Sequence, residues 1–254
     1  MNAWPTLEEA RLFLRQGTGR GVKVAVLDSG IESAHPLLRG LRLTDDFAVV
    51  ERDFQLTTIP GGGCDVFGHG TAIAGIIRQV APEAQIGSFR VLGEQLRSRT
   101  LFIREGARQA LERGYQILNC SFGCGREDQV LLYKDWIDEA YTRGCHVVAA
   151  SNNEDFMKRE WPGHFPTVNT VSFTRCDQLD ALFCRLGHLV EFAARGQDID
   201  VAWRGGAHKK VTGSSFAAPH VAGLLARLIS CCPALSPLHA KAVLQRLAEP
   251  WRSS

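Results

Sequence analysis

Short apolar runs alternate along the chain with longer segments in which apolar residues recur every three or four positions. The runs are rich in β-branched residues, as strands buried on both faces are, and cover 22–28, 84–92, 115–123, 145–151 and 164–173. The longer segments have helical spacing and cover 70–80, 99–114, 129–144, 214–231 and 236–250. This alternation predicts an α/β fold, with a mostly parallel sheet covered by helices on both faces.

Residues at the ends of these segments support the helix assignments. Gly114 and Gly144 follow two of the helices, where glycine commonly ends a helix. Ser236 precedes the last helix as a candidate N-cap. We expect residues 1–20 to form a short amphipathic helical extension. Since the 254 residues contain no repeat or linker, we expect 1–254 to be a single domain.

Composition and charge narrow the class of protein. The chain is 45% hydrophobic and 22% charged, which is typical of a globular protein with a large core. Its net charge is only +2, and no basic stripe interleaved with aromatic residues points to nucleic acid as a partner. No apolar run reaches about 18 residues, so no membrane span is expected. The N-terminus lacks the apolar core of a secretory signal.

The cysteines indicate the redox environment. All eight lie outside CxxC pairs and outside Cys/His clusters with zinc spacing, so we predict no metal site. Without a secretory signal, we interpret them as reduced thiols of a cytoplasmic protein, mostly packed as small hydrophobic side chains. The alternative is a disulfide between Cys176 and Cys184.

Polar residues follow several of the predicted strands, at the edge where the active groups of parallel sheets gather. Asp28 ends a strand in VAVLDSGI, Ser121 follows another in NCSFG, and Asn152 and Asn153 follow a third in VVAASNNED. A carboxylate at such an edge can hold an imidazole, and an asparagine amide can donate to a developing oxyanion. Taken singly, each residue is equally typical of a helix cap or a turn.

Two further stretches carry a histidine and a pair of serines. His69 lies between two glycines in DVFGHGTAIAGI, and glycines allow the backbone to approach closely. Ser214 and Ser215 open a helix in TGSSFAAPHVAG, where free N–H groups stabilise negative charge, although a serine there is also typical of an N-cap. The pattern alone does not choose between them. His220 is not the base of Ser215, because five helical residues turn by about 500° and leave it about 140° from that serine.

Together these stretches resemble the subtilisin-like serine peptidases, the subtilase family. Asp28, His69, Asn153 and Ser215 occur in the order of that family's motifs. NCSFG resembles its substrate-binding strand, and WPGHFPTVNTV resembles the segment after its asparagine. The resemblance covers residues 19–247 and implies a three-layer fold with a twisted, mostly parallel sheet. The chain departs from the family at Asn152, where glycine is usual.

The resemblance implies a mechanism. Ser215 would attack a peptide carbonyl, His69 would take its proton and pass it to the leaving amine, and Asp28 would orient the ring. Asn153 and the N–H of Ser215 would hold the oxyanion. One alternative is a catalytically silent pseudopeptidase that only binds peptides. Another is a general α/β hydrolase acting on esters, although the chain lacks that fold's GxSxG elbow.

The resemblance also implies substrate contacts. Ser121, Phe122 and Gly123 would pair with the substrate backbone as an added strand. Glu160 falls where the family floors the pocket for the residue before the cut, and Glu154 falls at the rim of that pocket. A carboxylate at the pocket floor would select Arg or Lys. The alternative is that Glu160 is a solvated acid in a charged loop.

Several expectations concern the setting of this activity. Secreted relatives usually carry a folding prodomain, which we do not expect here, and we assign no calcium to the loop with Asp45, Asp46 and Asp53. No cofactor is expected. We predict a compact cytoplasmic endopeptidase with a role in peptide maturation, which cleaves one partner or precursor peptide rather than digesting proteins in bulk. Its partner is a peptide or protein substrate, and we expect a monomer.

Overall fold

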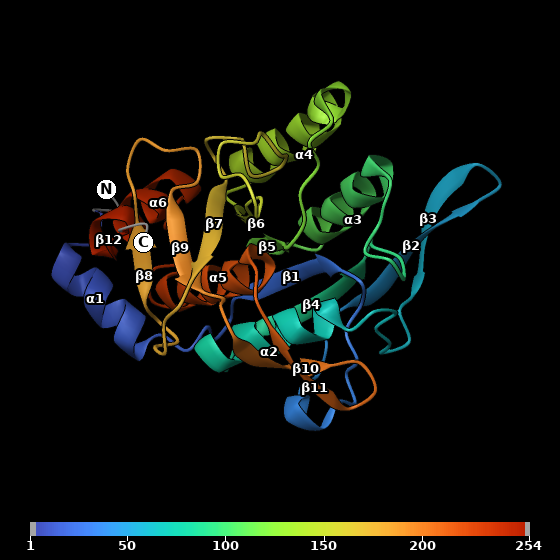
Figure 1. The fold of residues 1–254 in the computed structure, drawn as a ribbon, viewed down its shortest axis with the longest axis horizontal. Helices are drawn as coiled ribbons and strands as arrows, with labels where there is room; N and C mark the ends of the chain where they lie inside the picture. The colour runs from blue at the N-terminus through green and yellow to red at the C-terminus, as the bar shows by residue number, and fades with distance from the viewer. Residues whose placement is uncertain (1–3, 252–254) are drawn as a thin grey trace.

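One sheet runs through the protein, and the computed structural model describes it within residues 4–251. Its ten strands in this range are, in spatial order, β12 (Glu249–Pro250), β8 (Leu182–Cys184), β9 (Phe192–Arg195), β7 (Asn169–Thr174), β6 (His146–Ala150), β5 (Ile117–Cys120), β1 (Lys23–Asp28), β4 (Gln85–Arg90), β2 (Asp46–Arg52) and β3 (Gln55–Pro60). Neighbours are parallel except in the pairs β2–β3 and β8–β9. The predicted mostly parallel sheet is confirmed (Figure 1).

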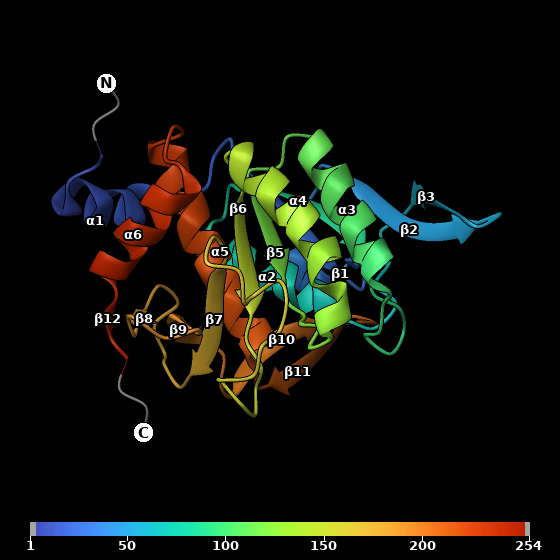
Figure 2. The same cartoon turned by 90° about the horizontal axis from the view of Figure 1, so that it is seen from above.

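Helices cover both faces of the sheet (Figures 1 and 2). One face carries α3 (Thr100–Glu112) and α4 (Val130–Thr142), and the other carries α2 (His69–Val80) and α5 (Ser214–Cys231). Two more helices pack near α5: α1 (Leu7–Gln16) contacts α5, and α6 (Pro237–Leu247) contacts α1. Two short 3₁₀ helices are η1 (Pro36–Leu38) and η2 (Glu127–Gln129). A separate hairpin, β10 (Ile199–Trp203) and β11 (Ala207–Val211), packs on α2 through β10.

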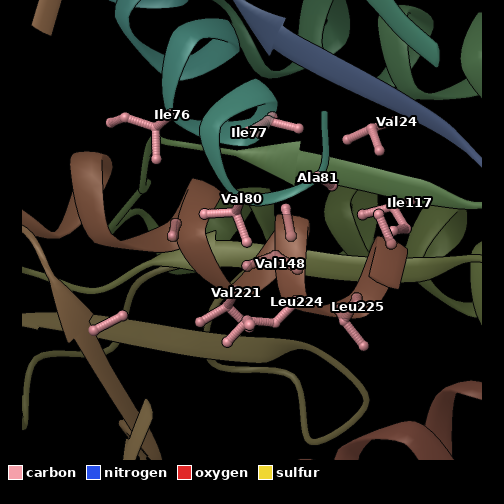
Figure 3. Packing of buried hydrophobic residues seen from close by; sticks show 14 of the residues in the cluster. Val24, Ile76, Ile77, Val80, Ala81, Ile117, Val148, Val221, Leu224 and Leu225 are labelled. Atoms are coloured by element: carbon pink, nitrogen blue, oxygen red, sulfur yellow. The ribbon is translucent and has the colours of Figure 1, made fainter. Parts of the chain in front are cut away.

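Alternate residues of the central strands enter two separate hydrophobic cores. In β1, Val24 and Val26 belong to the core shared with α2 and α5. Ala25 and Leu27 belong to the core beneath α3 and α4. Because successive side chains of a strand point to opposite faces, a strand between two cores is apolar at every position. Figure 3 shows part of the first core, where Val80 of α2 faces Val221 and Leu224 of α5.

Most predicted segment ends agree with the structure. Ser236 caps α6 by accepting the N–H of His239, and Gly114 and Gly144 follow α3 and α4 with φ angles of 71° and 74°. The strand predicted over 164–173 is shorter than expected and begins at Asn169. Turns closed by backbone hydrogen bonds precede it. A serine cap for α5 is wrong, because Gly213 is the N-cap and no side chain caps this helix.

The segment 46–60 is a hairpin rather than a loop, which corrects the interpretation of the stretch with Asp45, Asp46 and Asp53. Its strands β2 and β3 pair antiparallel and project from the edge of the sheet (Figure 1). Asp53 and Phe54 form the turn with φ angles of 49° and 61°, values that tight hairpin turns require and glycine or asparagine usually supplies.

The structure also bears on the expected absence of a membrane span and on the state of the cysteines. Across residues 4–251 no helix combines the length and apolar character needed to cross a membrane. All eight cysteines are free thiols in this part of the chain, so the alternative disulfide between Cys176 and Cys184 is not formed.

Gly223 sets how closely α5 approaches α2. A Cβ atom built on Gly223 would lie 2.6 Å from the Cβ of Val80, whereas one built on Gly75 of α2 would lie 3.5 Å from Leu38 in ordinary contact. We therefore expect Gly223→Ala to lower the free energy of unfolding by about 1–3 kcal/mol through overpacking. Gly75→Ala should raise it by about 0.5–1 kcal/mol, because alanine loses less entropy in a helix.

Urea unfolding followed by far-UV circular dichroism measures both variants against the wild type. Equal stability of Gly223→Ala and the wild type would contradict the view that this contact is tightly packed.

Candidate active site

Asp28 and His69 meet at the carboxyl end of β1. Asp28 is the fully buried last residue of this strand, and its Oδ1 accepts the N–H of Ser29 at 2.7 Å. His69 begins α2, and its Nδ1 lies 2.9 Å from each carboxylate oxygen of Asp28. Because a carboxylate only accepts hydrogen bonds, Nδ1 carries the hydrogen and Nε2 is left as the acceptor.

The surroundings of His69 favour its charged form. Burial is the largest influence and disfavours the imidazolium, but the charge and hydrogen bond of Asp28, with a smaller contribution from Asp65, raise the pKa above its ordinary 6.5. Lys209 on β11 opposes this rise. The ring of Phe216 packs 5.1 Å from the imidazole. The carboxylate of Asp28 therefore stabilises the imidazolium that forms when His69 accepts a proton.

The serine pair reaches the same edge of the sheet because α5 begins there. Ser214 is buried, and its hydroxyl donates to the carbonyl of Ser151 at 2.6 Å. Ser215 is partly exposed, and its hydroxyl donates to the carbonyl of Ser121 at 3.1 Å. Ser121 in turn donates its hydroxyl to the carbonyl of Ser215 at 2.8 Å. The hydroxyl of Ser215 can donate to His69 only after it has left the carbonyl of Ser121.

Asn153 lies against the first residues of α5. Its Oδ1 accepts the N–H of Ser214 at 2.9 Å, which leaves Nδ2 as the donor of this amide. Nδ2 lies on the side of Gly213, 3.5 Å from where a Cβ of that residue would stand. The amide of Asn153 therefore lies at the N-terminus of α5, the kind of place where an amide donor and helix N–H groups can stabilise negative charge.

Asn152, the neighbour of Asn153, connects the residues that follow β6 to Glu160. Its Oδ1 accepts the N–H groups of Glu154 and Asp155, each at 2.8 Å, and its Nδ2 donates to Oε1 of Glu160 at 2.8 Å. A Cβ built on Gly123 would lie 2.6 Å from Oε2 of Glu160. The carboxylate of Glu160 therefore lies directly beside the segment expected to bind substrate, whereas Glu154 is exposed.

The side chain of Glu160 is largely shielded from solvent, with 17% of its surface exposed. Lys158 brings its ammonium to 3.8 Å from Oε1 of Glu160, and Lys158 itself is more than half exposed. Backbone hydrogen bonds of 2.9 Å in both directions between Cys124 and Trp161 hold the two neighbouring segments together. Phe122 turns into the core beneath α3 and α4 and is partly buried there.

His220 lies apart from this group. Its Nδ1 lies 3.0 Å from the carbonyl of Leu179, and burial lowers the pKa of His220 to about 4. One buried acid at the site, Asp65, was missed by the sequence analysis. An acid shortly before a helix is a common capping signal, and that signal was available in DVFGHG. Residues 4–251 contain no cluster of three or more His, Cys, Asp or Glu that could hold a metal ion.

Comparisons with known proteins show a family and related folds for this chain. Residues 19–251 match the model of the subtilase family. The chain is 33% identical over 218 residues to subtilisin BL of Lederbergia lenta, which covers 82% of this chain and 76% of that protein. It is 34% identical over 237 residues to an intracellular serine protease of Paenibacillus polymyxa, covering 86% and 69% of the two chains. A cold adapted subtilisin-like serine proteinase of known crystal structure matches with a TM-score of 0.71 and 26% identity, over 89% of this chain and 82% of that one.

Histidine ring signals provide a direct check on these environments. We expect His69 to titrate above 6.5, because Asp28 stabilises the imidazolium, and His220 to titrate near 4, because burial disfavours its charge. NMR titration of the ring nitrogens measures both values. Asp28→Asn should lower the pKa of His69 and leave that of His220 unchanged. A wild-type midpoint for His69 below 6.5 would count against this account of the site.

Proposed function

The chain belongs to the subtilase family and is a subtilisin-like serine endopeptidase, and we propose that Asp28, His69 and Ser215 form its catalytic triad. The observation that best supports this assignment is the approach of Nδ1 of His69 to both oxygens of Asp28 at 2.9 Å. Ser215 fits the role of nucleophile because this residue is partly exposed, whereas its neighbour Ser214 is buried and its hydroxyl donates to the carbonyl of Ser151.

Substrate binding and activation of Ser215 are linked in this proposal. The substrate backbone pairs with the segment from Ser121 to Gly123 as an added strand. A substrate N–H that takes the carbonyl of Ser121 displaces the hydroxyl of Ser215 from that carbonyl, to which it donates at 3.1 Å. The freed hydroxyl then attacks the peptide carbonyl and transfers its proton to Nε2 of His69.

The remaining steps use the groups around α5. Nδ2 of Asn153 and the N–H of Ser215 bind the oxyanion of the tetrahedral intermediate. The imidazolium of His69, stabilised by Asp28, gives its proton to the leaving amine and leaves an acyl-enzyme on Ser215. His69 then activates a water molecule that hydrolyses the acyl-enzyme and restores the serine.

We propose that Glu160 gives the peptidase a preference for Arg or Lys before the cleaved bond. Its carboxylate lies against Gly123 and is largely shielded from solvent, which strengthens its attraction for a cation. The ammonium of Lys158, 3.8 Å away, illustrates the kind of partner that this carboxylate attracts. A basic substrate side chain would take the place of Lys158, whose side chain is more than half exposed.

We further propose that the enzyme acts in the cytoplasm on one partner or precursor peptide. The free cysteines support a reducing compartment, and a relative from Paenibacillus polymyxa is named an intracellular serine protease. A peptidase that shares a compartment with the cell's own proteins requires narrow selectivity. Fast, unselective digestion of casein by the purified protein would contradict this proposal.

Labelling with a fluorophosphonate tests the triad. Ser215→Ala is expected to lose both labelling and peptide hydrolysis, because the nucleophile is removed. Ser214→Ala is the matched control and should keep the label, because its hydroxyl donates to the carbonyl of Ser151. Mass spectrometry of the digested protein identifies the modified serine. A wild-type protein that binds peptides but takes no label on Ser215 would favour the pseudopeptidase alternative.

A peptide library tests the preference for basic residues. We expect Glu160→Gln to lower kcat/KM for substrates with Arg before the cut by about tenfold to 100-fold, the size of one charge-assisted hydrogen bond. Substrates with Leu at that position should be unaffected. Glu154→Gln, in the same segment but exposed, should have a smaller effect. Equal or better cleavage after Leu or Phe by the wild type would contradict the proposed pocket.

A further inference from the structure

Asp65 is a buried acid outside the triad, in the segment just before α2. Hydrogen-bond donors surround both of its oxygens. Oδ1 accepts from the hydroxyl of Ser29 at 2.8 Å and from the N–H groups of Phe67 and Gly68 at 2.9 and 2.7 Å. Oδ2 accepts from the N–H and the hydroxyl of Thr71 at 2.8 and 2.7 Å. A carboxylate bonded in this way holds its donors in fixed positions, because such charge-assisted bonds are strong.

These contacts join the two segments that carry Asp28 and His69. Ser29 follows Asp28 and donates its N–H to Oδ1 of that carboxylate at 2.7 Å. The hydroxyl of Ser29 also accepts the N–H of Gly70, the residue after His69, at 3.2 Å. Through Ser29, Asp65 therefore ties the end of β1 to the first turn of α2, next to the hydrogen bond between Asp28 and His69.

We propose that Asp65 is a positioning residue of this peptidase, which fixes the imidazole of His69 between Asp28 and Ser215 by holding the backbone on both sides of it. The inference rests on the proposed triad. Capping of α2 alone would need only the bonds from the backbone next to that helix. The bond from Ser29, 36 positions earlier in the chain, goes beyond capping and connects the helix to the strand of Asp28.

Charged groups face His69 from three elements. Asp28 comes from β1, Asp65 from the segment before α2 and Lys209 from β11, while α5 contributes the apolar ring of Phe216. Burial lowers the pKa of His69, the two carboxylates raise it, and Lys209 lowers it. Loss of the charge on Asp65 should therefore lower the pKa of His69. The ring would then stay neutral, and able to accept a proton, down to a lower pH.

Asp65→Asn is the direct test, because asparagine keeps the shape of the side chain but presents an NH₂ group to donors that need an acceptor. We expect kcat on a peptide substrate to fall about tenfold to 100-fold through misplacement of the ring. KM should be unchanged, and the acid limb of the pH profile of kcat/KM should move to lower pH.

Two further variants serve as controls. Asp46→Asn is matched, because Asp46 accepts the N–H of Gly63 at 2.6 Å nearer the start of the same loop. It should keep the wild-type kcat and pH profile. Lys209→Gln removes a positive charge that faces His69 and should move the acid limb in the opposite direction, to higher pH.

A folded Asp65→Asn variant with wild-type kcat and an unmoved acid limb overturns the inference, and so does a rise in KM at constant kcat. If that variant does not fold, Ser29→Ala decides, because it removes the bonds of the Ser29 hydroxyl to Asp65 and Gly70 and leaves the other four bonds to Asp65 in place. A fall in kcat of about tenfold then supports the inference, and an unchanged kcat overturns it. Failure of the triad itself is distinguishable, since the wild type would then neither cleave peptides nor react with a fluorophosphonate.

Discussion

The close packing of α2 against α5 fixes the geometry on which the active site depends. Gly223 of α5 lies so near Val80 of α2 that no side chain fits between them. Both helices begin at the same edge of the sheet, α2 with His69 and α5 with Ser214. A change in the separation of the helices therefore moves the histidine relative to the serines. A displacement of about 1 Å at a reacting group can cost about 100-fold in rate, so in the proposed triad this contact matters for catalysis as well as for stability.

The order of strands and helices is predictable from the sequence because the two have different apolar patterns. Strands between two cores are apolar at every position, whereas helices beside one core are apolar at every third or fourth position. β1 illustrates this, since the whole stretch from Val24 to Leu27 is buried and apolar. The edge that carries the site follows from the same pattern, because parallel strands end together and bring Asp28 close to Ser121. The choice between the two serines rested on the resemblance to a family. In the structure the two serines differ in burial, because Ser214 is buried with its hydroxyl bonded to the carbonyl of Ser151, whereas Ser215 is partly exposed.

Two features escaped prediction for different physical reasons. The hairpin of β2 and β3 turns at Asp53 and Phe54, and Phe54 carries a bulky ring at a positive φ angle that gives no turn signal in the sequence. Asp65 escaped because its surroundings, rather than its identity, make it unusual. A single acid before a helix predicts one or two capping bonds, and its bond to Ser29 depends on tertiary contacts between segments 36 positions apart.

Asp28 and Asp65 are both buried acids at one site, yet their partners give them different tasks. The donors to Asp65 are backbone N–H groups and short hydroxyls that keep their hydrogens, so its hydrogen bonds hold these groups in place, and its charge adds only a smaller contribution to the pKa of His69. Asp28 turns both oxygens toward the ring of His69, a partner whose charge changes when it accepts a proton. The residue type is the same in both places. What decides whether a carboxylate mainly stabilises a changing charge or mainly maintains the scaffold is whether its hydrogen-bonded partner can titrate.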